Sequence, residues 1–317
     1  MIAVLGECVI DLIDTAASRT FSAHVGGSPL NVAIGVRRLG HPTALLARFG
    51  SDRFGQLIAA HAADEGLDLS ASVNATQSAS LAVITKDSLG VPSYDFYLTG
   101  AADWQWSAEE LATLPVATTL LHTGSLVSWL PPSAPLIATL MQQTRATGQT
   151  IVTYDPNVRA GLGGTPEETV LQVETCIAAA HVVKASVEDL ALLYSRTDLT
   201  VGDLAALAQR WLALGPDLVV LTQGGDGATA YSRSRSTHRA ALPVSLVDTV
   251  GAGDAFMAGL IAGLADADIR PGGLRQFVEG HLEQLLDTAM AVSAFTCEQH
   301  GANPPTRKDL GNWRASQ

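Results

Sequence analysis

TIVTYDPNVR (residues 150–159), HVVKASVEDL (181–190) and DLVVLTQGGDG (217–227) belong to one alternating pattern that decides the fold. Each segment begins with a short apolar run, which indicates a buried strand. Helical patterns at 166–179 and 204–214 separate these strands. Such alternation predicts a mostly parallel sheet with helices on both faces. It also places the carboxyl ends of the strands, where ligands bind, along one edge.

The first hundred residues break this alternation. Further strands are expected at 2–5, 21–25, 43–49 and 119–122. Further helices are expected from Pro29 and over 54–63, 134–147 and 187–194. Residues 81–85 and 93–98 are expected to form a hairpin around a turn at 87–90. No helix separates the early strands near 8–26 or those near 81–104. We therefore expect these two segments to form a small antiparallel sheet, placed like a lid on a single domain spanning 1–317.

Composition excludes several classes of protein. The chain has 317 residues, 47% of them hydrophobic, and its 19 basic and 31 acidic residues give a net charge of −12. An acidic surface argues against binding to nucleic acid or to anionic membranes. The three cysteines are far apart and suit a reducing compartment, and the apolar run at 255–265 is too short to cross a bilayer. A cytoplasmic protein is expected.

The strongest local signal is DTVGAGDAF at residues 248–256, which precedes a long apolar helix. Gly251 and Gly253 permit a tight turn that points successive amide N–H groups at one place, where the helix dipole favours an anion. These amides could stabilise a transferring phosphoryl group, while Asp254 takes a proton from an attacking hydroxyl. A simple turn in which Asp254 caps the helix explains the same residues equally well.

A second signal lies at the start of the first expected helix. Gly26 and Gly27 let a ligand approach the backbone, and Asn31 offers a donor and an acceptor to a hydroxyl group. The simpler interpretation is a turn in which Ser28 caps the helix and Pro29 takes the first helical position.

Two more segments directly follow expected strands. DPNVR at 155–159 places Arg159, a rare cation in this chain, at the carboxyl edge of the sheet, although a surface turn would look the same. TQGGDG at 222–227 resembles a nucleotide-binding turn, with a plain hairpin turn as the alternative. The chain lacks a Walker-type phosphate loop, a complete dinucleotide fingerprint and a serine-nucleophile elbow.

Taken together, these segments resemble the PfkB family of carbohydrate kinases, also called the ribokinase-like family. Residues 26–40 are similar to its amino-terminal signature, 50–55 to its GSDxxG stretch and 248–256 to its carboxy-terminal signature. The order and spacing agree along nearly the whole chain. The resemblance implies a three-layer α/β fold with a β-sheet lid, and transfer of phosphate from ATP to a sugar hydroxyl.

The resemblance also implies roles for individual residues. Asp254 would be the catalytic base, and Arg159 would lie near the transfer point. The anion hole would comprise the amides of Gly251, Ala252, Gly253 and Asp254. Sugar hydroxyls would be held by Asp11, Gly26, Gly27, Asn31 and Asp254. The nucleotide would be bordered by Ser186, Thr222, Gly224, Gly227, Gly251 and Gly253.

Metal ions are implied as well. Asp248 and Thr249, with the stretch 293–303, match the place of a monovalent cation such as K⁺ in the family. The family's Asn-x-x-Glu motif for Mg²⁺ is altered here: Ser186 replaces the asparagine, and Asp189 or Glu188 supplies the carboxylate. An acidic pair that opens a helix is also explained by capping alone.

The identity of the sugar substrate is less clear from the sequence. Residues 6–11, 155–159, 184–186 and 96–104 look most like the fructokinase branch, so fructose is favoured. Ribose, 2-keto-3-deoxygluconate and nucleosides compete with it. Trp104 or Trp106 could face the pocket or pack the lid against the core. A homodimer through the lid would cover its exposed sheet.

Two other classes of function remain open at this stage. One is a sugar-sensing protein that binds but does not phosphorylate, and the intact Gly-Ala-Gly-Asp segment speaks against it. The other is a dinucleotide oxidoreductase on a related sheet, which the incomplete glycine fingerprint disfavours.

Overall fold

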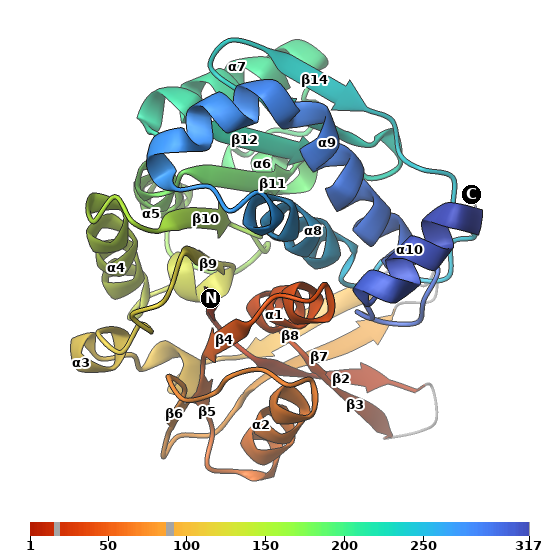
Figure 1. Cartoon of the computed structure of the whole chain (residues 1–317). Helices are drawn as coiled ribbons and strands as arrows, with labels where there is room; N and C mark the ends of the chain where they lie inside the picture. Colours follow the sequence, from red (N-terminus) through yellow and green to blue (C-terminus); the bar gives the residue numbers. More distant parts are fainter. Residues whose placement is uncertain (16–19, 87–91, 317) are drawn as a thin grey trace.

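The main sheet of the protein contains six parallel strands and an antiparallel edge (Figure 1). The computed structural model describes residues 1–15, 20–86 and 92–316. The strand order is β4-β1-β9-β10-β11-β12-β13-β14, with β13 and β14 antiparallel to their neighbours. The strands are β1 (Ile2–Leu5), β4 (Thr43–Leu46), β9 (Leu120–Gly124), β10 (Ile151–Asp155), β11 (Val182–Ser186), β12 (Leu218–Thr222), β13 (Ala228–Tyr231) and β14 (Ser236–Arg239).

Helices cover both faces of this sheet, as the alternating pattern predicts (Figure 1). One face packs against α1 (Ser28–Arg38), α2 (Arg53–Asp64), α8 (Ala252–Asp266) and α9 (Pro271–Cys297). The other packs against α3 (Ala108–Leu111), α4 (Ala134–Ala146), α5 (Pro166–Ala179), α6 (Val187–Leu193) and α7 (Val201–Leu214). The last helix, α10 (Arg307–Ser316), packs on α9. Short 3₁₀ turns are η1 (Ala102–Trp104), η2 (Leu126–Ser128) and η3 (Gly224–Asp226). The three-layer α/β prediction is confirmed.

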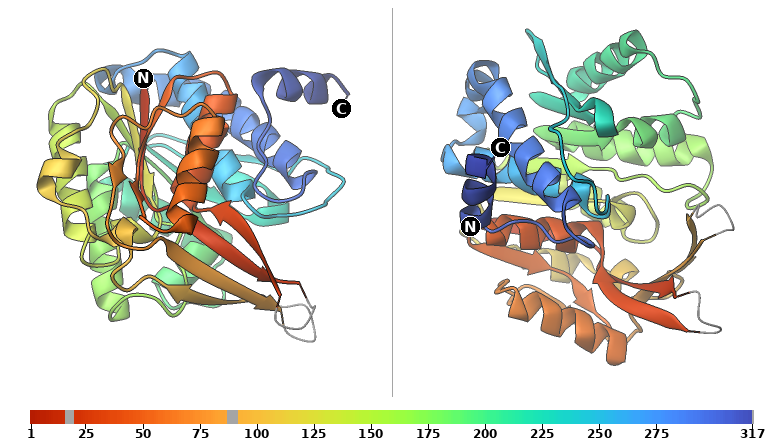
Figure 2. Two further views of the ribbon diagram at one scale, coloured as in Figure 1. Left: turned by 90° about the horizontal axis from the view of Figure 1, so that it is seen from below. Right: turned by 90° about the vertical axis from the view of Figure 1, so that its right-hand side faces the viewer.

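A second sheet of four strands extends away from the layered body (Figure 2). Its order is β3-β2-β7-β8, with bounds β2 (Val9–Asp14), β3 (Phe21–Gly26), β7 (Ser80–Lys86) and β8 (Pro92–Tyr97). The expectation of a purely antiparallel sheet is wrong, because the central pair β2 and β7 is parallel. Between these two strands the chain passes through α1, β4 and α2, so it can return to the sheet in the same direction. The hairpin of β7 and β8 is confirmed, and its turn lies outside the described residues.

The single strand expected over 43–49 is also wrong in detail. The chain leaves the main sheet at Ala47, whose carbonyl accepts a hydrogen bond from the Val73 amide. A separate pair then forms between β5 (Arg48–Phe49) and β6 (Val73–Asn74). Arg48 is buried there and donates to the Ala102 carbonyl at 2.8 Å, which ties this pair to η1.

The parallel strands end together at one edge, beside the four-stranded sheet. Loops after β9, β10, β11 and β12 start at this edge, and the first turn of α8 reaches it as well (Figure 1). In the part of the chain that is described, no helix is long and apolar enough to span a membrane.

Candidate active site

Asp254, in the first turn of α8, lies where α8 meets the start of α1. Its Oδ1 accepts a hydrogen bond from the Ser28 hydroxyl at 2.6 Å, and its Oδ2 accepts one from Asn31 Nδ2 at 2.8 Å. Burial raises the pKa of the Asp254 carboxyl above its usual value, although these two bonds and the charges of Lys184 and Arg159 oppose the rise. A carboxylate with a raised pKa accepts a proton more readily.

The helix begins with a turn that only glycine fits. Gly251 has φ 76°, and a Cβ there would lie 2.5 Å from the Ala302 Cβ. The Ala252 N–H donates to the Thr249 carbonyl at 3.2 Å, whereas the N–H groups of Gly253 and Asp254 meet no acceptor among the described residues. Two unpaired amides at the positive end of a 15-residue helix form a place for an anion.

A second carboxylate, Asp11, faces the same region from strand β2. Burial raises its pKa to about 6; the charges of His24 and Arg159 lower it, and the charge of Asp254 raises it. Gly26 lies beside it in β3, and a Cβ there would come within 2.5 Å of the Asp11 Oδ2. Glycine at this position therefore leaves the carboxylate room.

Arg159 is exposed and folds back onto its own loop, where it donates to Asn157 Oδ1 at 2.7 Å. Its charge still lowers the pKa of both Asp11 and Asp254. Asn31 and Asp254 are thus in direct contact, and Asp11 and Arg159 interact with Asp254 through their charges.

The two carboxylates considered for magnesium differ in their surroundings. Asp189 is buried: its Oδ1 accepts from the Val158 N–H at 2.7 Å, and its Oδ2 accepts from the amide and hydroxyl of Ser186 at 2.7 and 2.9 Å. Ser186 and Asp189 form a capping box on α6, so the capping interpretation is confirmed. Glu188 is exposed in the same turn. Oxygen ligands of this kind suit Mg²⁺, which keeps several waters when it binds, and the exposed Glu188 carboxylate is the more accessible of the two.

Asp248 closes the loop before α8. Its two oxygens accept from the Val250 and Gly301 amides, each at 3.0 Å. The Asp248 amide donates to the Cys297 carbonyl, so residues 248–249 lie against the stretch 293–303, as the resemblance implies. Backbone carbonyls and a carboxylate in one loop provide oxygen ligands that fit a hard cation.

The turn after β12 joins it to β13 as a hairpin that includes η3. Gly224 is exposed, Gly227 is buried, and the Gln223 amide donates to the Gly227 carbonyl at 2.8 Å. The Thr222 hydroxyl donates to the Ala185 carbonyl at 3.4 Å, which places this turn beside Ser186.

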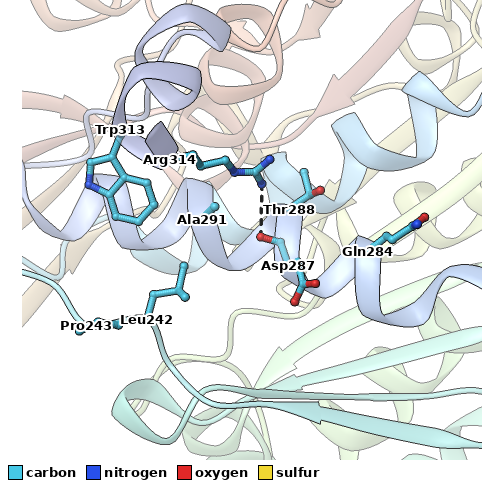
Figure 3. Close-up of a pocket in the computed structure, with 8 residues that line it drawn as sticks. All are labelled: Leu242, Pro243, Gln284, Asp287, Thr288, Ala291, Trp313 and Arg314. Carbon is cyan, nitrogen blue, oxygen red and sulfur yellow. Dashed lines mark hydrogen bonds between the residues drawn. The ribbon is translucent and has the colours of Figure 1, made fainter. Parts of the chain in front are cut away.

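A groove of about 520 Å³ lies between α9, α10 and the segment that contains Leu242 and Pro243 (Figure 3). It is lined by Leu242, Pro243, Gln284, Asp287, Thr288, Ala291, Trp313 and Arg314. Arg239, at the end of β14, forms an ion pair with Asp287 at 2.8 Å. This pair joins β14 to the side of the groove that α9 forms. Ser293 of α9 donates to the Ala252 carbonyl at 2.9 Å. Ser293 is five residues from Thr288, and at about 100° per residue its side chain points about 140° away, so the groove and the contact with α8 lie on different faces of α9.

Sequence reasoning missed several residues of this site. Ser28 does not cap α1, because Gly27 holds the cap position and the Ser28 hydroxyl bonds to Asp254 instead. Lys184 and Asp155 form a buried ion pair at 2.9 Å that the motifs do not reveal. A lysine and an aspartate at inward positions of adjacent strands are the signal that could have found them. Trp104 and Trp106 pack in the core, as their alternative interpretation holds.

An unpaired helix terminus facing a carboxylate, at the carboxyl edge of a parallel sheet, defines a site for transfer of an anionic group. Comparisons with known proteins agree. The model of the pfkB family of carbohydrate kinases matches residues 1–309. A fructokinase of Salmonella typhimurium is 34% identical over 97% of both chains, and one of Klebsiella pneumoniae is 36% identical over 83% of both. The crystal structure of a fructokinase from Xylella fastidiosa with bound ATP has a TM-score of 0.88 and 26% identity, and covers 100% of this chain and 99% of that chain.

The chain belongs to the pfkB family of carbohydrate kinases. It is an ATP-dependent sugar kinase of the fructokinase-like branch, with the ribokinase-like fold that its motifs imply.

Proposed function

We propose that this enzyme transfers the γ-phosphate of ATP to a hydroxyl of fructose, with Asp254 as the base. The observation that carries the proposal is the placement of a carboxylate of raised pKa beside the unpaired N–H groups of Gly253 and Asp254. The similarity to fructokinases along most of the chain favours fructose over other sugars.

Proton removal and charge stabilisation then both come from the first turn of α8. Asp254 accepts the proton of the sugar hydroxyl, whose oxygen forms the new bond to the γ-phosphorus as the bond to the β-phosphate oxygen breaks. The free amides of α8 and the helix dipole stabilise the charge on the migrating phosphoryl group. Ser28 and Asn31 hold the carboxylate in place through the two bonds that they donate.

The sugar lies between the edge of the main sheet and the four-stranded sheet, which acts as the lid. Asp11 accepts hydrogen bonds from sugar hydroxyls, and Gly26 and Gly27 allow the sugar close to the backbone. Closure of the lid excludes water and suppresses hydrolysis of ATP.

The base of the nucleotide occupies the groove in Figure 3, between Leu242, Ala291 and Trp313. Its phosphates run from there past Gly224 and Thr222 to the first turn of α8. This path is supported by the ion pair between Arg239 and Asp287, because Arg239 pairs with Ala228 beside Gly227 and Asp287 lines the groove.

Glu188 and Asp189 are the carboxylates that would hold a magnesium ion, which would neutralise charge on the phosphates when bound. Asp248 and Thr249 would hold potassium, which would stabilise the loop that precedes the anion hole. Both assignments rest on the oxygen ligands described above and on the resemblance to the family.

A homodimer would cover the exposed face of the lid. Tyr94 and Tyr97 of β8 are 49% and 62% exposed, and Tyr94 stacks with Phe96 at 6.1 Å between ring centroids. Light scattering of the purified protein tests this: a monomer at micromolar concentration would exclude a stable dimer.

The substrate is tested by measuring ADP release with fructose, tagatose, ribose, 2-keto-3-deoxygluconate and adenosine, each with and without K⁺. The highest kcat/KM is expected with fructose. A kcat/KM at least tenfold higher with another sugar would refute the substrate assignment, and the absence of ADP release with every sugar would refute the kinase function.

A further inference from the structure

Lys184 lies directly beneath the first turn of α8. It belongs to β11, and its neighbours Val183 and Ala185 face the opposite helical layer, so its side chain points toward α8. A Cβ built on Gly253 would lie 3.2 Å from the Lys184 Nζ. The lysine is 4% exposed, although the glycine above it faces solvent. The ammonium group is therefore adjacent to the unpaired amides of the anion hole.

Asp155, at the end of the adjacent strand β10, holds this ammonium group. Its Oδ2 accepts a hydrogen bond from the Lys184 Nζ at 2.9 Å, and both side chains are buried. Removing two charges from water costs free energy that their attraction often fails to repay, so a buried ion pair is weak evidence of a role in stability. This pair lies at a catalytic edge, where a role in function explains its presence better.

The charges around Lys184 keep it protonated. Burial lowers its pKa, but the negative charges of Asp155, Asp189 and Asp254 outweigh burial and raise the pKa above its usual value. His122 shares this face of the sheet, and burial and the charge of Lys184 lower its pKa to about 3. The histidine is neutral at physiological pH, so Lys184 supplies the positive charge here.

We propose that Lys184 is a further catalytic residue, whose ammonium group donates directly to the migrating phosphoryl group beside the amides of Gly253 and Asp254. An ammonium group has three N–H donors, and Asp155 takes one of them among the residues that the structure describes. Gly253 carries no side chain that would block the approach. Lys184 remains protonated throughout, since the proton of the sugar goes to Asp254. This inference rests on the proposed function.

The test compares Lys184→Met, Asp155→Asn and the double variant with Lys308→Met, which removes an exposed lysine on α10. Lys184→Met alone leaves Asp155 buried without its partner and can fail to fold, whereas the double variant is neutral at both positions and avoids that cost. For each variant, kcat, the Kd of ADP and the Kd of ADP with aluminium fluoride and fructose, a mimic of the transferring phosphoryl group, are measured together with Tm.

Loss of Lys184 is expected to lower kcat about 10²- to 10³-fold, as for one lost donor of an anion hole. Loss of Lys184 should weaken binding of ADP with aluminium fluoride and fructose by a similar factor, but change the Kd of ADP alone less than threefold. The double variant should show the same changes as Lys184→Met. A double variant with kcat within fivefold of the wild type, or an unchanged aluminium fluoride complex, would overturn the proposal. These results are interpreted against an active wild-type enzyme, so failure of the proposed function itself appears separately, as no ADP release by the wild type.

Discussion

Replacing Asp254 with asparagine isolates the proton transfer from the architecture of the site. The carboxylate accepts one hydrogen bond at each oxygen, from Ser28 at 2.6 Å and from Asn31 at 2.8 Å. An asparagine can keep its oxygen toward Asn31 and donate its amide to the Ser28 hydroxyl, which accepts as readily as it donates. Both contacts survive, and a group whose ionisation is opposed by burial becomes neutral. We therefore expect Tm and sugar affinity to change little.

The chemical step should change strongly. General-base catalysis contributes about 10²- to 10⁴-fold to rates, which is about 2.7–5.5 kcal/mol of the activation barrier. The assay measures kcat by ADP release, the sugar Kd by calorimetry, and Tm. Asp266→Asn, at the exposed other end of α8, is the matched control and should retain wild-type turnover. A kcat of Asp254→Asn within tenfold of the wild type, with sugar affinity intact, would refute the assignment of the base.

Three further perturbations follow from the same geometry. Burial raises the pKa of Asp11 to about 6, so its ionised, hydrogen-bond-accepting form is lost as pH falls through that value. Calorimetry should therefore show weaker sugar binding by the wild type at pH 5 than at pH 7.5. The Asp11→Asn variant should show no such change. Gly251→Ala places a side chain on a residue whose backbone is left-handed, at φ 76°, and directs it against Ala302. The conformation alone costs about 1–2 kcal/mol, before the clash is counted. Tm and kcat should fall, and adding Ala302→Gly should restore part of the loss. Trp313→Ala removes an aromatic wall of the groove worth about 1–1.5 kcal/mol, so the Kd of ADP should rise about five- to tenfold while the KM for sugar stays constant. Unchanged pH dependence, Tm or ADP affinity, respectively, would contradict each expectation.

Much of the main sheet could be predicted from sequence because its strands are buried on both faces. Ile151–Asp155 and Leu218–Thr222 are mostly apolar runs between helical patterns, and both lie within one residue of the expected bounds. The break at Ala47 could not be predicted, because Thr43–Phe49 is an uninterrupted strand pattern. What ends the strand is the pairing of Ala47 with Val73, a contact between residues distant in sequence.

The same limit applies to the parallel pairing of β2 with β7. Period-2 patterns give the face of each strand but not its partner or its direction. Because no helix interrupts either segment, 8–26 or 81–104, a simple antiparallel arrangement is expected. The direction of β7 depends on the path of the chain through α1, β4 and α2, which local patterns do not encode.

Some residues of the site could be predicted from local sequence, and others depend on contacts between distant segments. Asp254 and Asn31 lie in glycine-containing turns whose shape is determined by the local sequence. In the structure, Asn31 Nδ2 lies 2.8 Å from Asp254 Oδ2. Ser28 also lies in such a turn, and a serine before proline is typical of a helix cap. Here the tertiary contact with Asp254 of α8 overrides that local preference. Lys184 and Asp155 belong to different strands, and their 2.9 Å contact follows from the register of β10 against β11.

The division of the candidate site between two parts of the fold explains why the proposed base, Asp254, belongs to α8. Asp11 lies on β2, in the sheet that extends away from the body, whereas Ser28 and Asn31 lie on α1, which packs against α8 in the core. The border between the two is Gly27, whose φ of 110° lets strand β3 turn directly into α1. A movement of the sheet about this border would displace Asp11 while the two bonds to Asp254 stay within the packed helices. Proton transfer depends on small changes in donor–acceptor distance, so the proposed base and the amides beside it gain from sharing one rigid helix, while Asp11, the proposed partner of the sugar hydroxyls, can move with the four-stranded sheet.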